Sequence, residues 1–571
     1  MTSLTLQKRW LVAPAAPPEF IRRYRGMSPT LAQVLYNRGF TDPEAAYQFI
    51  YTKDCSHNPF ALTDMQKVVE RIRRAIRTKE HIVVYGDFDA DGVTSTTLMV
   101  QALRAFGAQV TPYIPHRADE GYGLNSPALV KLAKDGVKLV ITVDCGIRSV
   151  QEVEDGKAAG LDIIITDHHS LGAELPNAYA VVNPKREGYP EEMLAGVGVA
   201  FKVAQALLLA FSANTGRSKA PPLKIDSLLD LVAIGTVADL MPLNRPENRS
   251  LVRRGLEALN RAERPGVRAL LEVCGIKPGG VSAMSIGFGI GPRINAAGRL
   301  EDAMQAYKLL AASSERDAKE WAERLNTLNT RRQEITRAAQ DKIREKLGDV
   351  SMGSLIFASD SSFEPGIVGL VAGRLTEEYY LPAVIMEEGE TESRASCRSI
   401  PQFDITQALD QCADLLVRHG GHTLAAGFTV LNENIPALKD RLMGIAQDAL
   451  RGQTLSPGIE IDARLDIHQV SEDLINELEA LEPTGNGNTR PTFIVERARI
   501  LETRTVGKDE RHLKLKIARA GQPPLDAIGF GLGDWASQDV DCLDLAFQME
   551  INEWNGRQNL QLKLQDVRRA L

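Results

Sequence analysis

Short apolar runs alternate with longer stretches of helical periodicity between residues 81 and 182. The runs cover residues 81–85, 138–143, 161–166 and 180–182. Continuous apolar runs that are separated by helices are typical of parallel strands in a sheet covered on both faces. We therefore predict an α/β domain with a parallel sheet, in which ligands bind at the C-terminal ends of the strands.

The pattern changes on both sides of this region. Residues 1–60 have apolar positions at helical spacing and predict a small helical lead-in. Residues 314–347 are strongly charged, contain no proline or glycine, and predict one long helix that connects two domains. Apolar runs at 355–357 and 383–386 then predict strands of a second α/β domain.

Short strands dominate the C-terminal part of the chain. Residues 513–517 and 560–564 alternate between apolar and polar with period two, which predicts a small β domain compatible with a five-stranded barrel. The predicted organisation is a lead-in at 1–60, a first α/β domain at 61–313, a connecting helix at 314–347, a second α/β domain at 348–455 and a β domain at 456–571.

Composition narrows the class of protein. Of the 571 residues, 44% are hydrophobic and 25% are charged, which excludes a largely disordered or fibrous chain. The six cysteines form no C-x-x-C pair, so we expect neither a disulfide framework nor a thiolate zinc site, and we expect a cytoplasmic protein. Lys202 interrupts the apolar stretch 197–211, so we expect no membrane-spanning helix.

The net charge is −7, whereas nucleic-acid-binding proteins are often basic. If the chain binds nucleic acid, its positive charge must therefore be concentrated locally in a cleft.

Carboxylates and imidazoles follow three of the predicted strands. Asp87, Asp89 and Asp91 follow the first strand, Asp144 follows the second, and an Asp-His-His triplet at 167–169 follows the third. Because parallel strands end at the same edge of a sheet, we expect these side chains to meet there.

One further carboxylate, Asp239, lies in the otherwise apolar segment 234–242. Buried carboxylates need a partner or a metal ion. A set of aspartate oxygens and imidazole nitrogens without a thiolate suits Mn²⁺ or Mg²⁺ better than structural zinc. The number of ligands exceeds what one ion needs, so we expect two ions about 4 Å apart, the usual arrangement for phosphoester hydrolysis.

Six motifs, in this order along the chain, carry a family resemblance. The first four resemble those of the DHH phosphoesterase superfamily: GDFDADG at 86–92, VDCG at 143–146, DHH at 167–169 and TVADLMPL at 236–243. GPRINAAGR at 291–299 and GGHTLAAGF at 420–428 resemble its RecJ branch, which consists of single-strand-specific 5′→3′ exonucleases.

The resemblance covers the chain from about residue 60 and implies an α/β fold. A parallel-sheet DHH domain is linked by the long helix to a second α/β domain (DHHA1), and an all-β OB-fold domain follows. Segments 482–488 and 554–560 carry the resemblance to the OB-fold domain.

The resemblance also implies a set of metal ligands, with Asp144 bridging two ions. The implied ligands are Asp89, Asp91, Asp144, His168 and Asp239. His169 is implied to lie at the scissile phosphate, as a ligand or a direct contact. Asp87 and Asp167 count with it as catalytic residues, Asp87 as a carboxylate that orients a ligand.

A second implied set binds the substrate. It comprises Arg117, Arg299, Ser396, Arg398, Gly421 and His422. Arg117, Ser396 and Arg398 are implied to form a pocket for the terminal 5′-phosphate, since arginine binds phosphate bidentately. A glycine loop at 420–422 lets a phosphate approach the backbone, and a loop at 295–299 presents Arg299 to a backbone phosphate.

In the β domain, basic side chains are expected to line a groove for single-stranded DNA. The candidates are Arg504, Lys508, Arg511, Lys514 and Lys516. The aromatic side chains of Phe530, Trp535 and Trp554 are expected to pack in the core instead.

The implied activity is hydrolysis of single-stranded DNA to 5′-mononucleotides in the 5′→3′ direction, by two metal ions. The implied setting is recombinational and mismatch repair, as a monomer beside a single-strand-binding protein and a helicase, with no membrane partner. Two alternatives stay open: a DHH phosphodiesterase acting on short oligonucleotides, and a non-catalytic single-strand-binding scaffold. The C-terminal β domain argues against the first, and the complete set of ligand positions argues against the second.

Overall fold

The chain forms two compact units. The large unit contains Lys53–Arg451 and Pro483–Asn488, and the small unit contains Met1–Thr52, Gly452–Glu482 and Thr489–Leu571. The computed structural model describes residues 8–570, apart from residues 122, 216–220, 348–352, 508–509, 539 and 555–556.

The large unit begins with a five-stranded parallel sheet in the order β3-β2-β4-β5-β6. Its strands are β2 (His81–Gly86), β3 (Gln109–Tyr113), β4 (Leu139–Val143), β5 (Asp162–Thr166) and β6 (Ala180–Val182). The predicted parallel sheet is confirmed, and all four predicted runs are strands. The edge strand β3 is not evident in the sequence, because polar and exposed positions interrupt its apolar pattern.

Both faces of this sheet are buried. Ile82 and Val84 of β2 belong to one apolar cluster, whereas Val83 and Tyr85 belong to another on the opposite face. Successive strand residues point to opposite faces, so burial of both faces requires the continuous apolar runs seen in the sequence. The helices of this part are α4 (Met65–Thr78), α5 (Ala90–Ala105), α6 (Arg117–Glu120), α7 (Ser126–Lys134), α8 (Val150–Ala158), α9 (Gly196–Thr215) and α10 (Leu229–Ala238).

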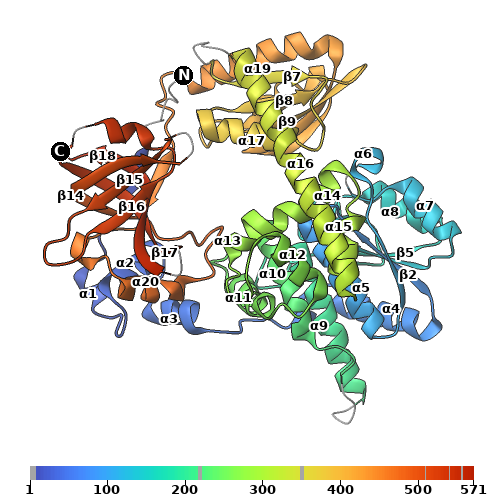
Figure 1. Cartoon of the computed structure of the whole chain (residues 1–571). Coiled ribbons are helices and arrows are strands. Elements are labelled where there is room, and N and C mark those ends of the chain that lie inside the picture. The colour runs from blue at the N-terminus through green and yellow to red at the C-terminus, as the bar shows by residue number, and fades with distance from the viewer. Residues whose placement is uncertain are drawn as a thin grey trace. The chain divides into compact units, whose positions relative to one another are not determined.

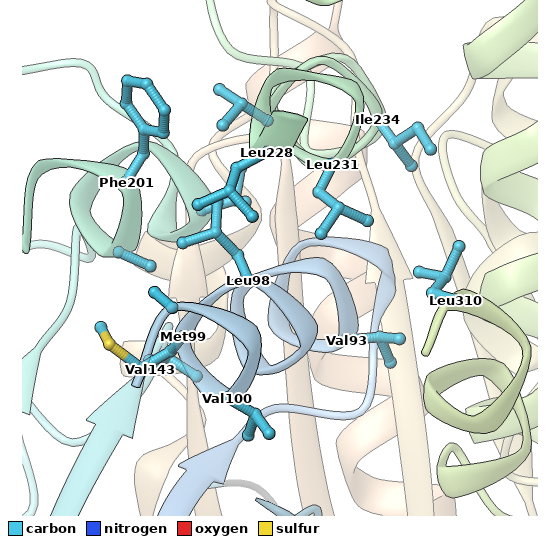
Figure 2. Packing of buried hydrophobic residues seen from close by; sticks show 14 of the residues in the cluster. Val93, Leu98, Met99, Val100, Val143, Phe201, Leu228, Leu231, Ile234 and Leu310 are labelled. Atoms are coloured by element: carbon cyan, nitrogen blue, oxygen red, sulfur yellow. The ribbon is translucent and has the colours of Figure 1, made fainter. Parts of the chain in front are cut away.

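Helix α5 lies at the centre of the larger apolar cluster. Figure 2 shows Val93 and Leu98 of α5 among Phe201 of α9 and Leu231 and Ile234 of α10. All five side chains are fully buried. Because α5 begins and α10 ends at the C-terminal edge of the sheet, this packing fixes the helix ends that carry the predicted metal ligands.

Helix α9 is long and apolar enough to cross a membrane, by length and composition alone. In its window Gly196–Ala213, 61% of the residues are buried inside the structure, where α9 packs against α5 and α10. The sequence predicts no such helix because Lys202 interrupts the apolar run. The structure shows that Lys202 is fully buried in an ion pair with Glu247, so the lysine does not end the apolar helix.

A group of shorter helices and one long helix follow. They are α11 (Pro246–Arg261), α12 (Pro265–Val273), α13 (Ala283–Ser285), α14 (Gly291–Leu300), α15 (Met304–Leu310) and α16 (Glu315–Leu347). Helix α16 confirms the predicted long helix, and Figure 1 shows it passing from α15 towards α17 (Val368–Tyr379).

A second, mixed sheet in the large unit has the strand order β10-β11-β9-β8-β7. Its strands are β7 (Ile356–Asp360), β8 (Ala383–Glu387), β9 (Glu392–Arg398), β10 (Leu416–His422) and β11 (Ala425–Leu431). Only β7 and β8 pair in parallel. Helices α17, α18 (Ile405–Asp410) and α19 (Ile435–Leu450) complete the predicted second α/β domain.

The small unit is built on a closed barrel of five strands in the order β14-β15-β16-β18-β17, with β17 returning to β14. The strands are β14 (Phe493–Val506), β15 (His512–Ile517), β16 (Leu525–Gly529), β17 (Cys542–Trp554) and β18 (Arg557–Arg569). Strand β13 (Ala463–Arg464) pairs in parallel with β14, and helix α20 (Glu472–Leu478) lies between β13 and β14 in the sequence. The barrel confirms the predicted five-stranded β domain.

The N-terminal segment belongs to the small unit. Strand β1 (Arg9–Val12) pairs in parallel with β12 (Gly458–Ile461). Leu31 and Leu35 share one apolar core with Phe493 and Phe547 of the barrel. The helices that supply this side of the core are α1 (Pro18–Ile21), α2 (Pro29–Asn37) and α3 (Pro43–Tyr51). The segment is therefore not the separate lead-in that the sequence predicts, because pairing across more than 400 residues leaves no local pattern.

Three candidate DNA-binding side chains of the barrel are partly neutralised. Lys514 forms an ion pair with Asp526 at 3.4 Å. Lys516 and Arg504 both pair with Glu502, at 3.5 and 3.7 Å. A fourth candidate, Lys508, lies outside the described part of the chain.

The aromatic side chains of the barrel differ in burial. Trp535 packs against the core of the small unit, as expected. Phe530 is 56% exposed, so its predicted place in the core is wrong. The Trp554 side chain lies outside the described part of the structure.

The turn at 483–488 packs with the large unit, although its sequence resembles OB-fold domains. Asn486 accepts a hydrogen bond from the Leu243 N–H at 2.7 Å and donates one to the Leu240 carbonyl. The turn lies close to Leu243, since a Cβ on Gly485 would lie 2.9 Å from Leu243 Cδ1. The contact supports the loop that follows Asp239.

A buried ion pair holds the start of the large unit. Lys202 pairs with Glu247 and donates to the His57 carbonyl at 2.9 Å. The Tyr189 hydroxyl and the His57 N–H donate to the same carboxylate, at 2.6 and 3.0 Å.

We predict that Lys202→Met lowers the free energy of unfolding of the large unit by about 3–5 kcal/mol, because Glu247 stays buried without its cation. Chemical denaturation followed by circular dichroism measures this change. Lys131→Met, on an exposed position of α7, is the control and should change it by less than about 0.5 kcal/mol. An unchanged denaturation midpoint for Lys202→Met would contradict the prediction.

Candidate active site

The acidic turn after β2 caps helix α5. Asp89 Oδ1 accepts hydrogen bonds from the N–H groups of Asp91 and Gly92, at 2.9 and 3.0 Å. These are N–H groups that a helix start leaves unpaired, so the motif is a helix cap as well as an acidic cluster. Asn295 of α14 accepts a hydrogen bond from the Ala90 N–H at 2.7 Å and fixes the turn from outside.

The start of helix α9 holds Asp91. The N–H groups of Gly196 and Val197 donate to its two carboxylate oxygens at 2.7 and 2.9 Å. The positive end of a helix dipole stabilises a carboxylate there. A Cβ on Gly196 would lie 2.6 Å from Asp144 Cβ, so only glycine permits this approach. This segment was not among the predicted site residues, although its Gly-Val-Gly pattern at 196–198 was a usable signal.

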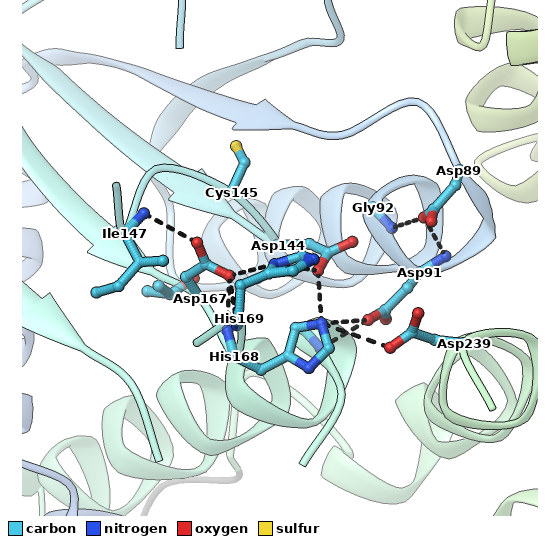
Figure 3. A network of polar contacts seen from close by, with 12 residues as sticks. Asp89, Asp91, Gly92, Asp144, Cys145, Ile147, Asp167, His168, His169 and Asp239 are labelled. Carbon is cyan, nitrogen blue, oxygen red and sulfur yellow. Dashed lines mark hydrogen bonds and ion pairs between the residues drawn. The ribbon is translucent and has the colours of Figure 1, made fainter. Parts of the chain in front are cut away.

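Three further ligand candidates converge on Asp91 from separate elements (Figure 3). His168 Nε2 lies 3.1 Å from Asp144 Oδ1, 3.4 Å from Asp239 Oδ2 and 3.8 Å from Asp91 Oδ2. Asp144 follows β4 with φ +63°, the left-handed region that few non-glycine residues adopt. The structure thus brings together Asp91, Asp144, His168 and Asp239, as the sequence predicts.

Asp167 organises the histidine pair. Its Oδ1 accepts hydrogen bonds from the N–H groups of His168 and His169, at 2.7 and 3.0 Å. The same oxygen lies 2.8 Å from His169 Nδ1, and Oδ2 accepts the Ile147 N–H at 2.9 Å. All these contacts of the Asp167 carboxylate are with its own loop or with Ile147, so the carboxylate fixes the backbone of the His168–His169 segment.

Burial and mutual repulsion alter the titration of the cluster. Burial, reinforced by Asp89, raises the pKa of Asp91 to about 7, and burial with the charge of Asp91 raises the pKa of Asp239 to about 9. Burial and the neighbouring aspartates also raise the pKa of Asp144 well above its ordinary value. Burial lowers the pKa of His168 to about 3, so its imidazole is neutral, the form that binds metal ions.

The cluster fits divalent cations. Three groups have ligand atoms within 4.8 Å of one another: Asp144, His168 and His169; Asp91, His168 and Asp239; and Asp87, Asp89 and Asp144. Four buried atoms of these residues have no hydrogen-bond partner: Asp87 Oδ1, Asp144 Oδ1, His168 Nε2 and Asp239 Oδ2. Such atoms are costly unless an ion satisfies them, and hard oxygen-rich sets suit Mn²⁺ or Mg²⁺. Asp87 therefore has the geometry of a ligand as well as of an orienting carboxylate.

Four arginines lie near one another beside the acidic cluster. Burial, together with the charges of Arg117, Arg332 and Arg398, lowers the pKa of Arg299 to about 10. The Arg117 guanidinium lies 4.8 Å from the centre of the Phe88 ring, within the acidic turn. Arg332 of α16 was not predicted, because the charged pattern of a long helix does not reveal which residues face inward.

Helix α17 approaches Ser396 and Arg398 closely. Arg398 donates to Ser396 Oγ at 3.3 Å, from two residues further along β9. A Cβ on Gly369 of α17 would lie 2.9 Å from this Oγ atom and 3.4 Å from Arg398 Nη2. The first turn of α17 therefore passes directly over Ser396 and Arg398.

Arg299 lies near the C-terminal end of helix α14, so the predicted loop at 295–299 is wrong. The helix packs closely against the acidic turn, since a Cβ on Gly298 would lie 2.4 Å from the Phe88 carbonyl oxygen. Arg299 itself donates to the Gly366 carbonyl at 3.1 Å.

The predicted glycine loop at 420–422 is also wrong, because Gly421 and His422 belong to strand β10. Ala425 of β11 pairs with His422 on one side and with Arg398 on the other. His422 is thus two strands from Arg398, roughly 10 Å away across the sheet. The structure does not bring Gly421 and His422 into the arginine group directly.

Three family descriptions match the chain. "DHH family, N-terminal domain" matches residues 81–236, "DHHA1 domain" matches 352–448, and "RecJ OB domain" matches 461–566. The first two lie in the large unit and the third in the small unit, apart from the turn at 483–488.

The chain is also similar to individual proteins over most of its length. It is 39% identical to the single-stranded-DNA-specific exonuclease RecJ of Bacillus subtilis over 549 residues, which cover 95% of this chain and 68% of that protein. A crystal structure of RecJ from Thermus thermophilus in complex with Mn²⁺ matches with a TM-score of 0.84 and 29% identity. That match covers 99% of this chain and 80% of the other.

A second structure of the same protein, with Mg²⁺, matches with a TM-score of 0.78 and 28% identity, over 99% and 79% of the two chains. The fold, the order of the three domains and the identity over nearly the whole chain agree. The chain therefore belongs to the RecJ family of single-stranded-DNA-specific exonucleases.

Proposed function

We propose that this exonuclease degrades single-stranded DNA from the 5′ end and releases 5′-mononucleotides, with two divalent cations in the acidic cluster. The observation that carries the proposal is the set of unpartnered carboxylate and imidazole atoms beside a group of arginines. Metal ligands on one side and phosphate-binding groups on the other are what phosphodiester hydrolysis requires.

Mn²⁺ or Mg²⁺ is the cofactor of the site, consistent with the Mn²⁺ and Mg²⁺ complexes of the relative from Thermus thermophilus. When bound, the two ions supply a nucleophile at neutral pH and stabilise the charge on the attacked phosphate. We assign Asp89, Asp91, Asp144, His168 and Asp239 as the residues that would hold the ions. Asp144 and His168 each belong to two of the three ligand groups, and of these two only the Asp144 carboxylate has two oxygens with which to serve both ions.

His169 and Asp87 have supporting roles in this proposal. The His169 ring is half exposed and is oriented by Asp167, so it can contact the scissile phosphate. Asp87 joins the ligand group formed with Asp89 and Asp144.

The polarity follows from the arginine group. Arg117, Ser396 and Arg398 hold the terminal 5′-phosphate, so that the next phosphodiester bond lies at the residues that would hold the ions. Arg299 contacts a backbone phosphate. His422 and Gly421, two strands from Arg398, contact the DNA backbone further along. Arginine is suited to the terminal group because its planar guanidinium can bind two phosphate oxygens at once.

The cellular setting belongs to the same proposal. The enzyme acts in recombinational and mismatch repair as a cytoplasmic monomer, beside a single-strand-binding protein and a helicase. Activity confined to very short oligonucleotides would favour a small-substrate phosphodiesterase instead. Retained DNA binding without hydrolysis would favour a scaffold.

An end-labelled oligonucleotide tests polarity and metal dependence together. With Mn²⁺, we expect immediate release of a labelled mononucleotide from a 5′-labelled strand and a descending ladder from a 3′-labelled strand. Asp144→Ala should lower the rate by more than about a hundredfold, the upper range for residues that only support metal ligands. DNA binding by this variant, measured by fluorescence anisotropy, should be largely retained. Near-wild-type hydrolysis by Asp144→Ala would refute the assignment of two metals.

Asp239→Asn separates metal binding from folding. In EDTA at neutral pH we expect the variant to have a higher melting temperature than the wild type. Burial raises the pKa of Asp239 to about 9, so folding must protonate this carboxyl, whereas asparagine needs no proton. With Mn²⁺ its stabilisation should be smaller than that of the wild type, because a ligand is lost. Differential scanning calorimetry measures both changes, and equal Mn²⁺-induced shifts in the two proteins would contradict the assignment.

Arg398→Ala tests the terminal pocket. Loss of a hydrogen bond to a charged group is worth about 1.5–3 kcal/mol, so the preference for a 5′-phosphate over a 5′-hydroxyl end should fall about 10–100-fold in kcat/KM. Arg394→Ala, at an exposed position of the same strand, is the matched control and should leave the preference unchanged. A preference that survives in Arg398→Ala would exclude this residue from the pocket.

A further inference from the structure

The end of strand β6 contacts the backbone of the histidine pair. Asn183 Nδ2 donates to the His169 carbonyl at 3.0 Å, and Lys185 Nζ donates to the His168 carbonyl at 2.6 Å. Asn183 Oδ1 also accepts the Lys185 N–H at 2.9 Å, which joins the two residues in one turn. Two consecutive carbonyl groups therefore accept hydrogen bonds from two side chains of the turn that follows β6.

These contacts complement those of Asp167. Asp167 binds the N–H groups of His168 and His169, whereas Asn183 and Lys185 bind their carbonyl groups. The backbone on both sides of the imidazoles is thus fixed by side chains from opposite directions. A rotation of either peptide group would break at least one of these bonds and would turn a ring away from the site.

The types of side chain suit these tasks. Asn183 is fully buried and needs one donor and one acceptor, which an amide side chain supplies and a carboxylate does not. The Lys185 bond is charge-assisted and short, so it is stronger than a neutral hydrogen bond. Its ammonium also acts on Asp167 and Asp239 from within electrostatic range, which reduces the excess negative charge of the cluster.

We propose that Asn183 and Lys185 are positioning residues of the active site, each of which orients one of the two histidines. Lys185 orients His168 and thereby sets the affinity for the divalent cation, and Asn183 orients His169 and thereby sets the turnover rate. The proposal rests on the assignment of His168 as a metal ligand and of His169 as a phosphate contact. Neither Asn183 nor Lys185 touches the metal or the scissile phosphate in this scheme.

Isothermal titration of Mn²⁺ into the 571-residue protein, without DNA, tests the role of Lys185. We expect Lys185→Met to raise the dissociation constant for Mn²⁺ about 10–100-fold, the range found for residues that orient metal ligands. Loss of the Lys185 charge alone would act in the opposite direction and lower this constant. Lys185→Arg keeps a charged donor and should stay within about threefold of the wild type. Lys131→Met is the control for the loss of a positive charge elsewhere in the large unit.

A purely structural role for Lys185 predicts a different result. In that case Lys185→Met would lower the melting temperature in EDTA and leave the Mn²⁺ dissociation constant unchanged, which would overturn the proposal. Failure of Lys185→Arg to restore Mn²⁺ binding would also overturn it. If the wild type itself binds no Mn²⁺, the proposed function fails rather than this inference.

Asn183→Asp tests the second half of the proposal. The substitution is nearly isosteric and keeps the acceptor for the Lys185 N–H, but it removes the donor to the His169 carbonyl. We expect kcat on 5′-phosphorylated single-stranded DNA to fall at least about tenfold at saturating Mn²⁺, with KM within about threefold of the wild type. If kcat of Asn183→Asp falls only as much as its folded fraction, measured by circular dichroism, the proposed role of Asn183 is overturned. Asn183→Ser repeats the test without an added charge.

Discussion

Repulsion among buried carboxylates is the constraint on which the rest of the large unit depends. Asp87, Asp91, Asp144 and Asp239 come from separate elements, and their pKa values all rise on burial beside one another. The chain opposes this repulsion mainly with dipoles: N–H groups at the start of α9 and backbone donors to neighbouring carboxylates. Backbone dipoles stabilise the carboxylates but do not cancel their negative charge. The cluster can therefore still bind divalent cations.

The surrounding fold serves to hold this unfavourable arrangement in place. Helices α5 and α10 are locked in an apolar core at one end and present Asp91 and Asp239 at the other. Glycines at 196, 235 and 298 let backbone and carboxylates approach to distances that any side chain would prevent. Burial of the repelling carboxylates costs folding free energy. Packing of the apolar core, away from the site, offsets this cost, as is common at functional sites.

The positive charges near the acidic cluster are concentrated in a small group of arginines. The chain carries a net charge of −7, yet Arg117, Arg299 and Arg398 gather where burial and mutual repulsion lower the pKa of Arg299. On the barrel, by contrast, Lys514 and Lys516 are paired with acidic neighbours. A phosphate group that reaches the acidic cluster would therefore meet several arginines beside it.

The sequence by itself determined the parallel sheet, the long connecting helix, the β barrel and the convergence of Asp89, Asp91, Asp144 and His168. Periodicity records burial, and parallel strands that end in polar residues must present them at one edge. Only the tertiary structure decided which distant segments meet: residues 9–12 beside 458–461, the 483–488 turn beside the loop after Asp239, and Asn183 and Lys185 behind the histidine pair. It also placed Arg299 on a helix and His422 on a strand. Contacts of this kind depend on glycine clearance and on single hydrogen bonds between residues far apart in the chain, and neither leaves a periodic trace in the sequence.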